Sequence, residues 1–143
     1  MIVAIPTELK NNENRVALTP AGAHELRRLG HSVTVQSGAG NGAGFSDDDY
    51  RHAGAQILSD ADKLWADASI VVKVKEPIPQ EYRHLREGLV LFTYLHLAAN
   101  PDLTRALQSS GTTAIAYETV RSAAGTLPPP APMRRPTSCA TGQ

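Results

Sequence analysis

Short runs of apolar and β-branched residues alternate along the chain with polar segments that carry helix signals. Six runs bounded by turn residues predict β-strands at 2–5, 32–36, 55–58, 69–74, 88–94 and 112–117. Because these runs are apolar on both faces, they favour a mainly parallel sheet with helices on each side. The pattern therefore predicts an α/β fold with a Rossmann-like sheet.

Five helices are predicted between the strands. The first has the clearest signals, since Thr19 can cap it, Pro20 suits its first turn and Gly30 can end it. The other four are expected to open at Ser46, Ser59, Pro79 and Pro101. The third is expected to end near Trp65 and the fifth near Gln108.

The chain divides into a patterned part and a proline-rich part. Residues 1–122 predict one domain, which a chain of 143 residues is long enough to bury around a core. Residues 123–143 hold five of the ten prolines and have no periodic apolar face, so we expect a divergent tail with little fixed structure. Arg134 and Arg135 lie in this tail without aromatic or glycine partners, which favours a solvated pair over a phosphate or nucleic-acid site.

Charge and composition exclude several classes of partner. The 14 basic residues balance the 14 acidic ones, so no summed field attracts nucleic acid or an anionic membrane. The one cysteine, Cys139, cannot form an internal disulfide and fits a reducing compartment. No apolar run approaches the roughly 20 residues that span a bilayer, and the start of the chain lacks a basic segment before its apolar run. We therefore expect a soluble cytoplasmic protein.

A glycine-rich stretch at 38–43 fits the looser form of the dinucleotide-binding motif. The helix after it would open with three aspartates at 47–49, whose charges would repel the phosphates of a nucleotide. The loop also continues through 44–46, so the tight turn of the motif is absent. A glycine-rich surface or interface loop is favoured over a nucleotide site.

Three polar residues follow predicted strands, and in a parallel sheet they would share one edge. Arg15 can grip a carboxylate with two N–H groups, Lys75 can polarise a carbonyl, and His96 titrates near neutral pH. Each has a structural alternative: a solvated loop arginine, a lysine that reaches water from the strand face it shares with Lys73, and a hydrogen-bonded histidine. The other four histidines show no spacing typical of a metal site.

Five segments resemble the amino-terminal domain of alanine dehydrogenase, in order and at matching positions. They are NNENRVALTPAG (11–22), SGAGNGAGFSDDDYRHAGA (37–55), VVKVKEP (71–77), LFTYLHLA (91–98) and IAYETV (115–120). The resemblance covers about residues 1–133. It implies the substrate-binding part of an oxidoreductase that interconverts L-alanine with pyruvate and ammonia and uses NAD.

The resemblance also implies roles for individual residues. Arg15 and Lys75 are expected to bind the substrate carboxylate and carbonyl, and His96 to act as general acid and base. Such chemistry needs a fixed cation for the carboxylate and a group that takes up the released protons. Tyr94 and Met133 are expected to line the pocket, although Tyr94 suits strand packing equally well. The family forms homo-hexamers, but much of that interface is expected to lie outside this chain.

The resemblance ends before several parts of the family pattern appear. The long helix, the NAD-binding domain and a return segment are absent from these 143 residues, and Arg134 stands where the family has serine. We therefore expect a truncated chain, with a sheet incomplete relative to the family domain, that neither binds NAD nor turns over substrate alone. Two alternatives stay open: the first domain of a proton-translocating NAD(P) transhydrogenase, which lacks the YLHLA histidine, and a non-catalytic carboxylate-binding or interaction remnant.

Overall fold

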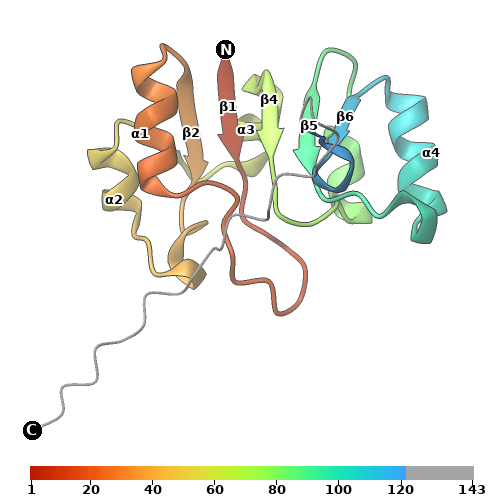
Figure 1. The fold of residues 1–143 in the computed structure, drawn as a ribbon, viewed down its shortest axis with the longest axis horizontal. Helices are drawn as coiled ribbons and strands as arrows, with labels where there is room; N and C mark the ends of the chain where they lie inside the picture. Colours follow the sequence, from red (N-terminus) through yellow and green to blue (C-terminus); the bar gives the residue numbers. More distant parts are fainter. Residues whose placement is uncertain (122–143) are drawn as a thin grey trace, which may run out of the picture.

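The computed structural model describes residues 1–121, which form one six-stranded sheet with helices on both faces (Figure 1). All of its strand pairs are parallel, which confirms the predicted α/β fold. The strands are β1 (Ile2–Ile5), β2 (Ser32–Gln36), β3 (Gln56–Leu58), β4 (Ile70–Val72), β5 (Val90–Thr93) and β6 (Thr113–Ala116). The α-helices are α1 (Pro20–Arg28), α2 (Asp47–His52), α3 (Ala61–Asp67) and α4 (Pro101–Ser110).

Side-chain caps fix where the helices begin. The Thr19 hydroxyl accepts a hydrogen bond from the backbone N–H of Gly22, which opens α1 as the sequence predicts. Ser46 and Asp49 form a reciprocal capping box on α2. The prediction for α3 was one residue early, because its cap is Asp60 and not Ser59.

Three further details differ from the sequence prediction. The segment that opens at Pro79 is a 3₁₀ helix, η2 (Pro79–His84), and α4 extends two residues beyond Gln108 to Ser110, where Gly111 ends it in a left-handed conformation. The predicted strand 69–74 is also too long, because β4 ends at Val72. Three more 3₁₀ turns complete the described part: η1 (Asn41–Ala43), η3 (Leu97–Ala99) and η4 (Tyr117–Thr119).

The order of the strands creates the place where a ligand can bind. Across the sheet the order is β3-β2-β1-β4-β5-β6. The chain therefore places β2 and β3 on one side of β1 and then crosses back to place β4, β5 and β6 on the other side of β1. The connections after β1 and β4 therefore run to opposite faces of the sheet, and in open α/β sheets ligands bind at this reversal of strand order. In Figure 1 the two strands lie side by side at the centre of the sheet.

Alternate residues of the strands feed two separate cores. One core packs Val3, Ile5, Val33 and Val35 against Ala23 of α1 and Tyr50 of α2. The other packs Ala4, Val71 and Leu91 against Leu64 and Trp65 of α3 and Leu103 of α4. Because both faces of the central strands are buried, the strands are apolar on both sides, as parallel sheets require.

The helices of residues 1–121 are short. The longest, α4, has ten residues, and none in this range combines the length and apolar character needed to cross a bilayer.

Candidate functional site

The polar residues that the sequence singles out lie in the loops that follow three neighbouring strands. Arg15 lies in the loop after β1, Lys75 in the loop after β4, and His96 in the loop after β5. Since β1, β4 and β5 are adjacent and parallel, all three loops leave the same edge of the sheet. Tyr94 lies on the segment between β5 and His96, and Met133 lies outside the described residues.

Arg15 is held by an acid from its own loop. Its Nε and Nη2 atoms donate to the two carboxylate oxygens of Glu13 at 2.8 and 2.5 Å, and its backbone N–H donates to the same carboxylate at 3.0 Å. These bonds lower the pKa of Glu13 and raise that of Arg15, and the charge of Lys75 also lowers the pKa of Glu13. The side chain of Glu13 is 7% exposed and that of Arg15 is 48% exposed. The Nε and Nη2 side of the guanidinium is therefore held by Glu13, whereas Nη1 makes no hydrogen bond to residues 1–121.

The loop that carries Arg15 packs against the glycine-rich stretch. A Cβ atom on Gly42 would lie 2.8 Å from the backbone oxygen of Asn14, so only glycine permits this approach. Asn12 adopts a left-handed conformation with φ 63°, which asparagine tolerates better than most residues. The glycine-rich stretch therefore supports the position of Arg15.

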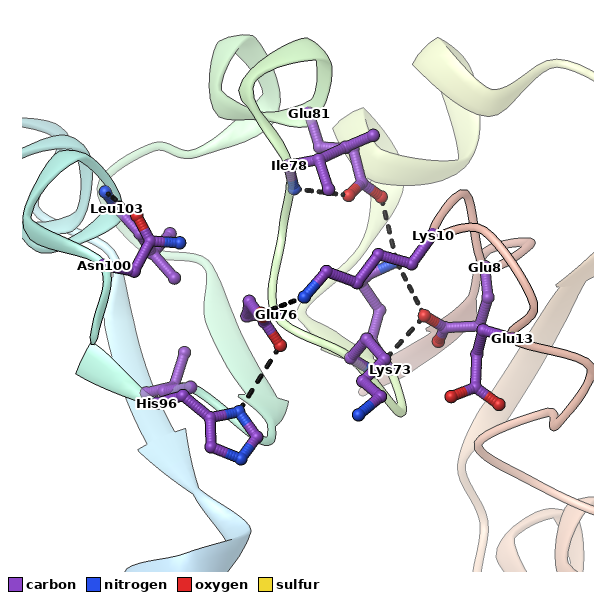
Figure 2. Close-up of polar contacts among 12 residues, drawn as sticks. Glu8, Lys10, Glu13, Lys73, Glu76, Ile78, Glu81, His96, Asn100 and Leu103 are labelled. Atoms are coloured by element: carbon purple, nitrogen blue, oxygen red, sulfur yellow. Dashed lines mark hydrogen bonds and ion pairs between the residues drawn. The ribbon is translucent and has the colours of Figure 1, made fainter. Parts of the chain in front are cut away.

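A buried cluster of ionised groups joins three loops at this edge. Lys73, whose side chain is 1% exposed, places its Nζ 3.3 Å from Oε2 of Glu8 and 2.9 Å from Oε1 of Glu81 (Figure 2). Glu8 also accepts hydrogen bonds from the backbone N–H groups of Val74, at 2.6 Å, and Lys75, at 3.3 Å. The cluster thus ties the loop after β1 and η2 to the backbone that carries Lys75.

This burial corrects the expectation for Lys73. The sequence placed it on a strand face with Lys75, reaching water, but β4 ends at Val72 and the chain turns Lys73 inward toward two acids. Lys75 is partly exposed, and within residues 1–121 its ammonium makes neither an ion pair nor a hydrogen bond. The two lysines therefore differ, one being structural and the other available to a ligand.

His96 occupies a constrained backbone position with an accessible ring. Its φ of 47° lies in the left-handed region, which is uncommon for a residue with a side chain. The carboxylate of Glu118 accepts hydrogen bonds from the N–H groups of Leu95 at 3.1 Å and His96 at 2.9 Å, which stabilises this turn. The imidazole is 52% exposed, and its Nδ1 lies 3.5 Å from Oε2 of Glu76.

Aromatic rings separate the histidine from the sheet. The ring of Tyr94 stacks on that of His96, with ring centroids 5.8 Å apart. It also packs against the ring of Tyr117, with centroids 5.0 Å apart. Tyr117 packs in turn on Phe92, and burial raises the pKa of Tyr117 to about 12. Tyr94 is therefore both packed against the end of the sheet and in contact with His96, so both expectations for this residue stay open.

Two hollows flank these groups. One, of about 440 Å³, opens beside the loop of His96 and is lined by Leu95–Ala99, Ala116, Glu118 and Thr119. The other, of about 170 Å³, lies between the loop after β1 and the glycine-rich stretch, and Glu8, Glu13 and Arg15 contribute to it. His96 thus borders the first hollow and Arg15 the second, whereas Lys75 lines neither.

The glycine-rich stretch does not fit a dinucleotide. The carboxylate of Asp47 accepts hydrogen bonds from the N–H of Gly38 at 2.8 Å and from the hydroxyl of Ser37 at 2.6 Å, where a phosphate would bind in a nucleotide site. A Cβ on Gly40 would come within 2.8 Å of Phe45, so the loop is filled by its own neighbours. Residues 1–121 also contain no group of three or more potential metal ligands.

Sequence reasoning missed the acids that organise this edge. Glu8, Glu13, Glu76 and Glu118 each contact a predicted site residue or its backbone. All four lie on segments that follow strands, the position that selected Arg15, Lys75 and His96, so the same rule could have found them.

Comparisons with known proteins agree with this architecture. The chain is 59% identical over 133 residues to the alanine dehydrogenase of Mycolicibacterium smegmatis, covering 93% of this chain and 36% of that protein. A solved L-alanine dehydrogenase matches 89% of the chain with a TM-score of 0.85 and 48% identity, and covers 35% of that structure. A transhydrogenase from Sinorhizobium meliloti matches 82% of the chain and 35% of its own, with a TM-score of 0.74 and 33% identity.

The chain therefore spans little more than a third of the length of these relatives. The family model described as the alanine dehydrogenase/PNT N-terminal domain matches residues 4–134, which is most of the chain. This chain belongs to the family of alanine dehydrogenase/PNT N-terminal domains.

Proposed function

We propose that this chain is the substrate-binding domain of an NAD-dependent L-alanine dehydrogenase and binds alanine or pyruvate at the edge formed by β1, β4 and β5. The observation that carries the proposal is the placement of Arg15, Lys75 and His96 after three adjacent parallel strands. In open α/β sheets this edge, at the reversal of strand order, is where ligands bind.

The two cations suit the two polar ends of a 2-oxo acid. Glu13 occupies the Nε and Nη2 side of Arg15, which leaves the Nη1 end of the half-exposed guanidinium for a ligand carboxylate. The ammonium of Lys75 forms no ion pair within residues 1–121, and its backbone N–H donates to Glu8. Its ammonium can therefore bind the carbonyl oxygen of pyruvate or lie beside the carboxylate.

His96 is proposed as the group that exchanges protons with the bound substrate. Its ring is accessible, and it lies beside Tyr94 at the same edge as the two cations. An imidazole in this position can give a proton to the substrate carbonyl oxygen or take one back. In the family, NAD accepts the hydride, but residues 1–121 offer no cradle for it, so no hydride step is assigned to them.

The same observations favour an alanine dehydrogenase over a transhydrogenase. Among solved structures, the chain is 48% identical to an L-alanine dehydrogenase but 33% identical to the transhydrogenase. Hydride exchange between two nicotinamides also needs no proton carrier at the position of His96.

Calorimetric titration with pyruvate tests the proposal. The chain should bind pyruvate, and Arg15→Gln should weaken binding at least tenfold, because it removes a charge-assisted pair worth ~1.5–3 kcal/mol. Arg28→Gln is the matched control, since that arginine forms an exposed pair on α1. Pyruvamide, which lacks the carboxylate, should bind poorly to every variant. Equal affinity of the two arginine variants would contradict the proposal.

The 143-residue chain alone should not reduce NAD in the presence of alanine. The measurement is absorbance of the reduced nicotinamide against a blank without protein. Turnover above the blank that His96→Ala abolishes would show that these residues suffice for catalysis and would contradict this part of the proposal.

A further inference from the structure

Glu76 has one carboxylate oxygen whose hydrogen bonding is incomplete. Its side chain is 10% exposed and lies directly after Lys75, where Pro77 restricts the backbone. Oε1 is paired with the ammonium of Lys10, whereas Oε2 is buried and has no hydrogen-bond partner among residues 1–121. A buried carboxylate oxygen without a donor is costly, so a donor is expected close to it.

The imidazole of His96 is the group that Oε2 faces. Figure 2 shows the ring turned with Nδ1 toward Glu76, and the separation between Nδ1 and Oε2 is 3.5 Å, slightly longer than a hydrogen bond. An ionised carboxylate can only accept, so an attractive contact requires a proton on Nδ1. The Nε2 atom makes no hydrogen bond to residues 1–121.

The surroundings keep Glu76 ionised. Burial raises the pKa of Glu76, but the hydrogen bond and charge of Lys10, together with the contact to His96, bring it below the ordinary value. Glu118, the other acid near His96, is engaged with the backbone N–H groups of Leu95 and His96. Glu76 is therefore the acid that faces the ring.

We propose that Glu76 is a positioning residue that holds His96 in the tautomer protonated on Nδ1, so that Nε2 is the nitrogen that exchanges protons with substrate. The assignment of Nε2 to substrate rests on the function proposed above, whereas the tautomer is a property of this chain alone. Lys10 supports the arrangement because it fixes the far oxygen of Glu76. The acid thus selects which ring nitrogen is basic, as second partners of functional histidines commonly do.

Nitrogen-15 NMR of the imidazole side chains tests the proposal directly. The spectrum is recorded at about pH 9, well above the ordinary range of imidazole titration. In the full chain, His96 should show a protonated Nδ1 and an unprotonated Nε2. His52 is an internal reference, because its Nδ1 lies 2.8 Å from the backbone oxygen of Asp48, which can only accept.

Variants at Glu76 provide the comparison. In Glu76→Gln the amide oxygen should keep the ammonium of Lys10, so the amide NH2 group faces Nδ1 and donates to it. Glu76→Gln and Glu76→Ala should therefore both give His96 the Nε2-protonated form that free histidine prefers in water, while His52 keeps its signal. Glu25→Gln, at an exposed pair on α1, should change neither histidine. An Nε2-protonated His96 in the unmodified chain, or a tautomer unaffected by either Glu76 variant, would overturn the proposal.

The outcome is separable from that of the proposed function. An Nδ1-protonated His96 in a chain that does not bind pyruvate would support the role of Glu76 and refute the substrate assignment. Pyruvate binding by a chain with an Nε2-protonated His96 would support the substrate assignment and refute the role of Glu76.

Discussion

The ammonium of Lys73 and the carboxylate of Glu8 form an ion pair that is almost wholly buried between the ends of β1 and β4, with Nζ 3.3 Å from Oε2. Glu81 approaches the same ammonium at 2.9 Å, so one cation serves two buried acids. An arrangement of this kind is expensive to break, because each partner left alone is a buried charge. It gives the candidate site a rigid base beneath Lys75.

Removal of the buried cation should destabilise the protein severely. Lys73→Met keeps the volume of the side chain but leaves Glu8 and Glu81 facing each other, and should lower the free energy of unfolding by about 3–5 kcal/mol. Urea denaturation measures the change. Lys63→Met is the control, since its pair with Asp67 is exposed and should contribute less than about 1 kcal/mol. Equal stability of the two variants would refute a structural role for the cluster.

Glu118 should control the backbone at His96. Glu118→Ala removes the acceptor of two N–H groups, so amide hydrogen exchange at Leu95 and His96 should accelerate about tenfold, equivalent to ~1.4 kcal/mol. Glu118→Gln should restore most of the protection, because Oε1 accepts both bonds in the structure and an amide oxygen can do the same. If the alanine and glutamine variants exchange alike, charge and not hydrogen bonding holds the turn.

The pair of Glu13 and Arg15 should give the stability a dependence on acid pH. Hydrogen bonding from Arg15 lowers the pKa of Glu13 in the folded protein below its ordinary value of 4.5. The pair therefore stabilises the fold fully above about pH 4.5, and this stabilisation is lost as the pH falls through the lower pKa of the folded state. Glu13→Gln should therefore cost about 1 kcal/mol between pH 5 and 7, and the difference should shrink below about pH 4.5. Denaturation across this range measures it.

Arg15→Gln should give the same pH profile, because either change breaks the one pair. A difference between Glu13→Gln and the unmodified chain that persists unchanged to pH 3 would show that the carboxylate acts through something other than its charge.

Gly42 should matter to ligand binding although it has no side chain that could bind the ligand. Gly42→Ala would place a Cβ 2.8 Å from the Asn14 backbone and displace the residue that precedes Arg15, so pyruvate affinity should fall on the order of tenfold. Gly44→Ala is the matched control: its φ is +86° but no atom lies within 4 Å, so it should cost about 1–2 kcal/mol of stability and leave affinity unchanged. Titration calorimetry compares them. Unchanged affinity in Gly42→Ala would mean that the loop adapts.

The fold was predictable because its signals are local. The alternation of apolar runs with capped helical segments, such as the one that begins at Thr19 and Pro20, determined the α/β class and the order of the elements. Segment ends were less predictable. Segment boundaries depend on hydrogen bonds that neighbouring polar residues compete to form. Examples are the cap of α3, which is Asp60 and not Ser59, and the end of β4 at Val72.

The candidate site was predictable only in part. The rule that ligands bind beyond the carboxyl ends of parallel strands selects Arg15, Lys75 and His96. It does not reveal that Lys73 is buried, since its partners lie 65 residues before it, at Glu8, and eight after it, at Glu81. A single acid carries no periodic pattern, and its role appears only when the strand order brings the loops together.

If Arg15, Lys75 and His96 contact the same 2-oxo acid, NMR mapping of pyruvate binding will show all three loops responding together. Two-dimensional ¹H–¹⁵N spectra recorded during a pyruvate titration should show saturable shifts concentrated in residues 13–15, 74–76 and 94–96. Arg15→Gln should need at least about tenfold more pyruvate to produce these shifts, and pyruvamide should not reproduce them. No saturable shift, or saturable shifts confined to other parts of the chain, would show that these three residues do not form the pyruvate site.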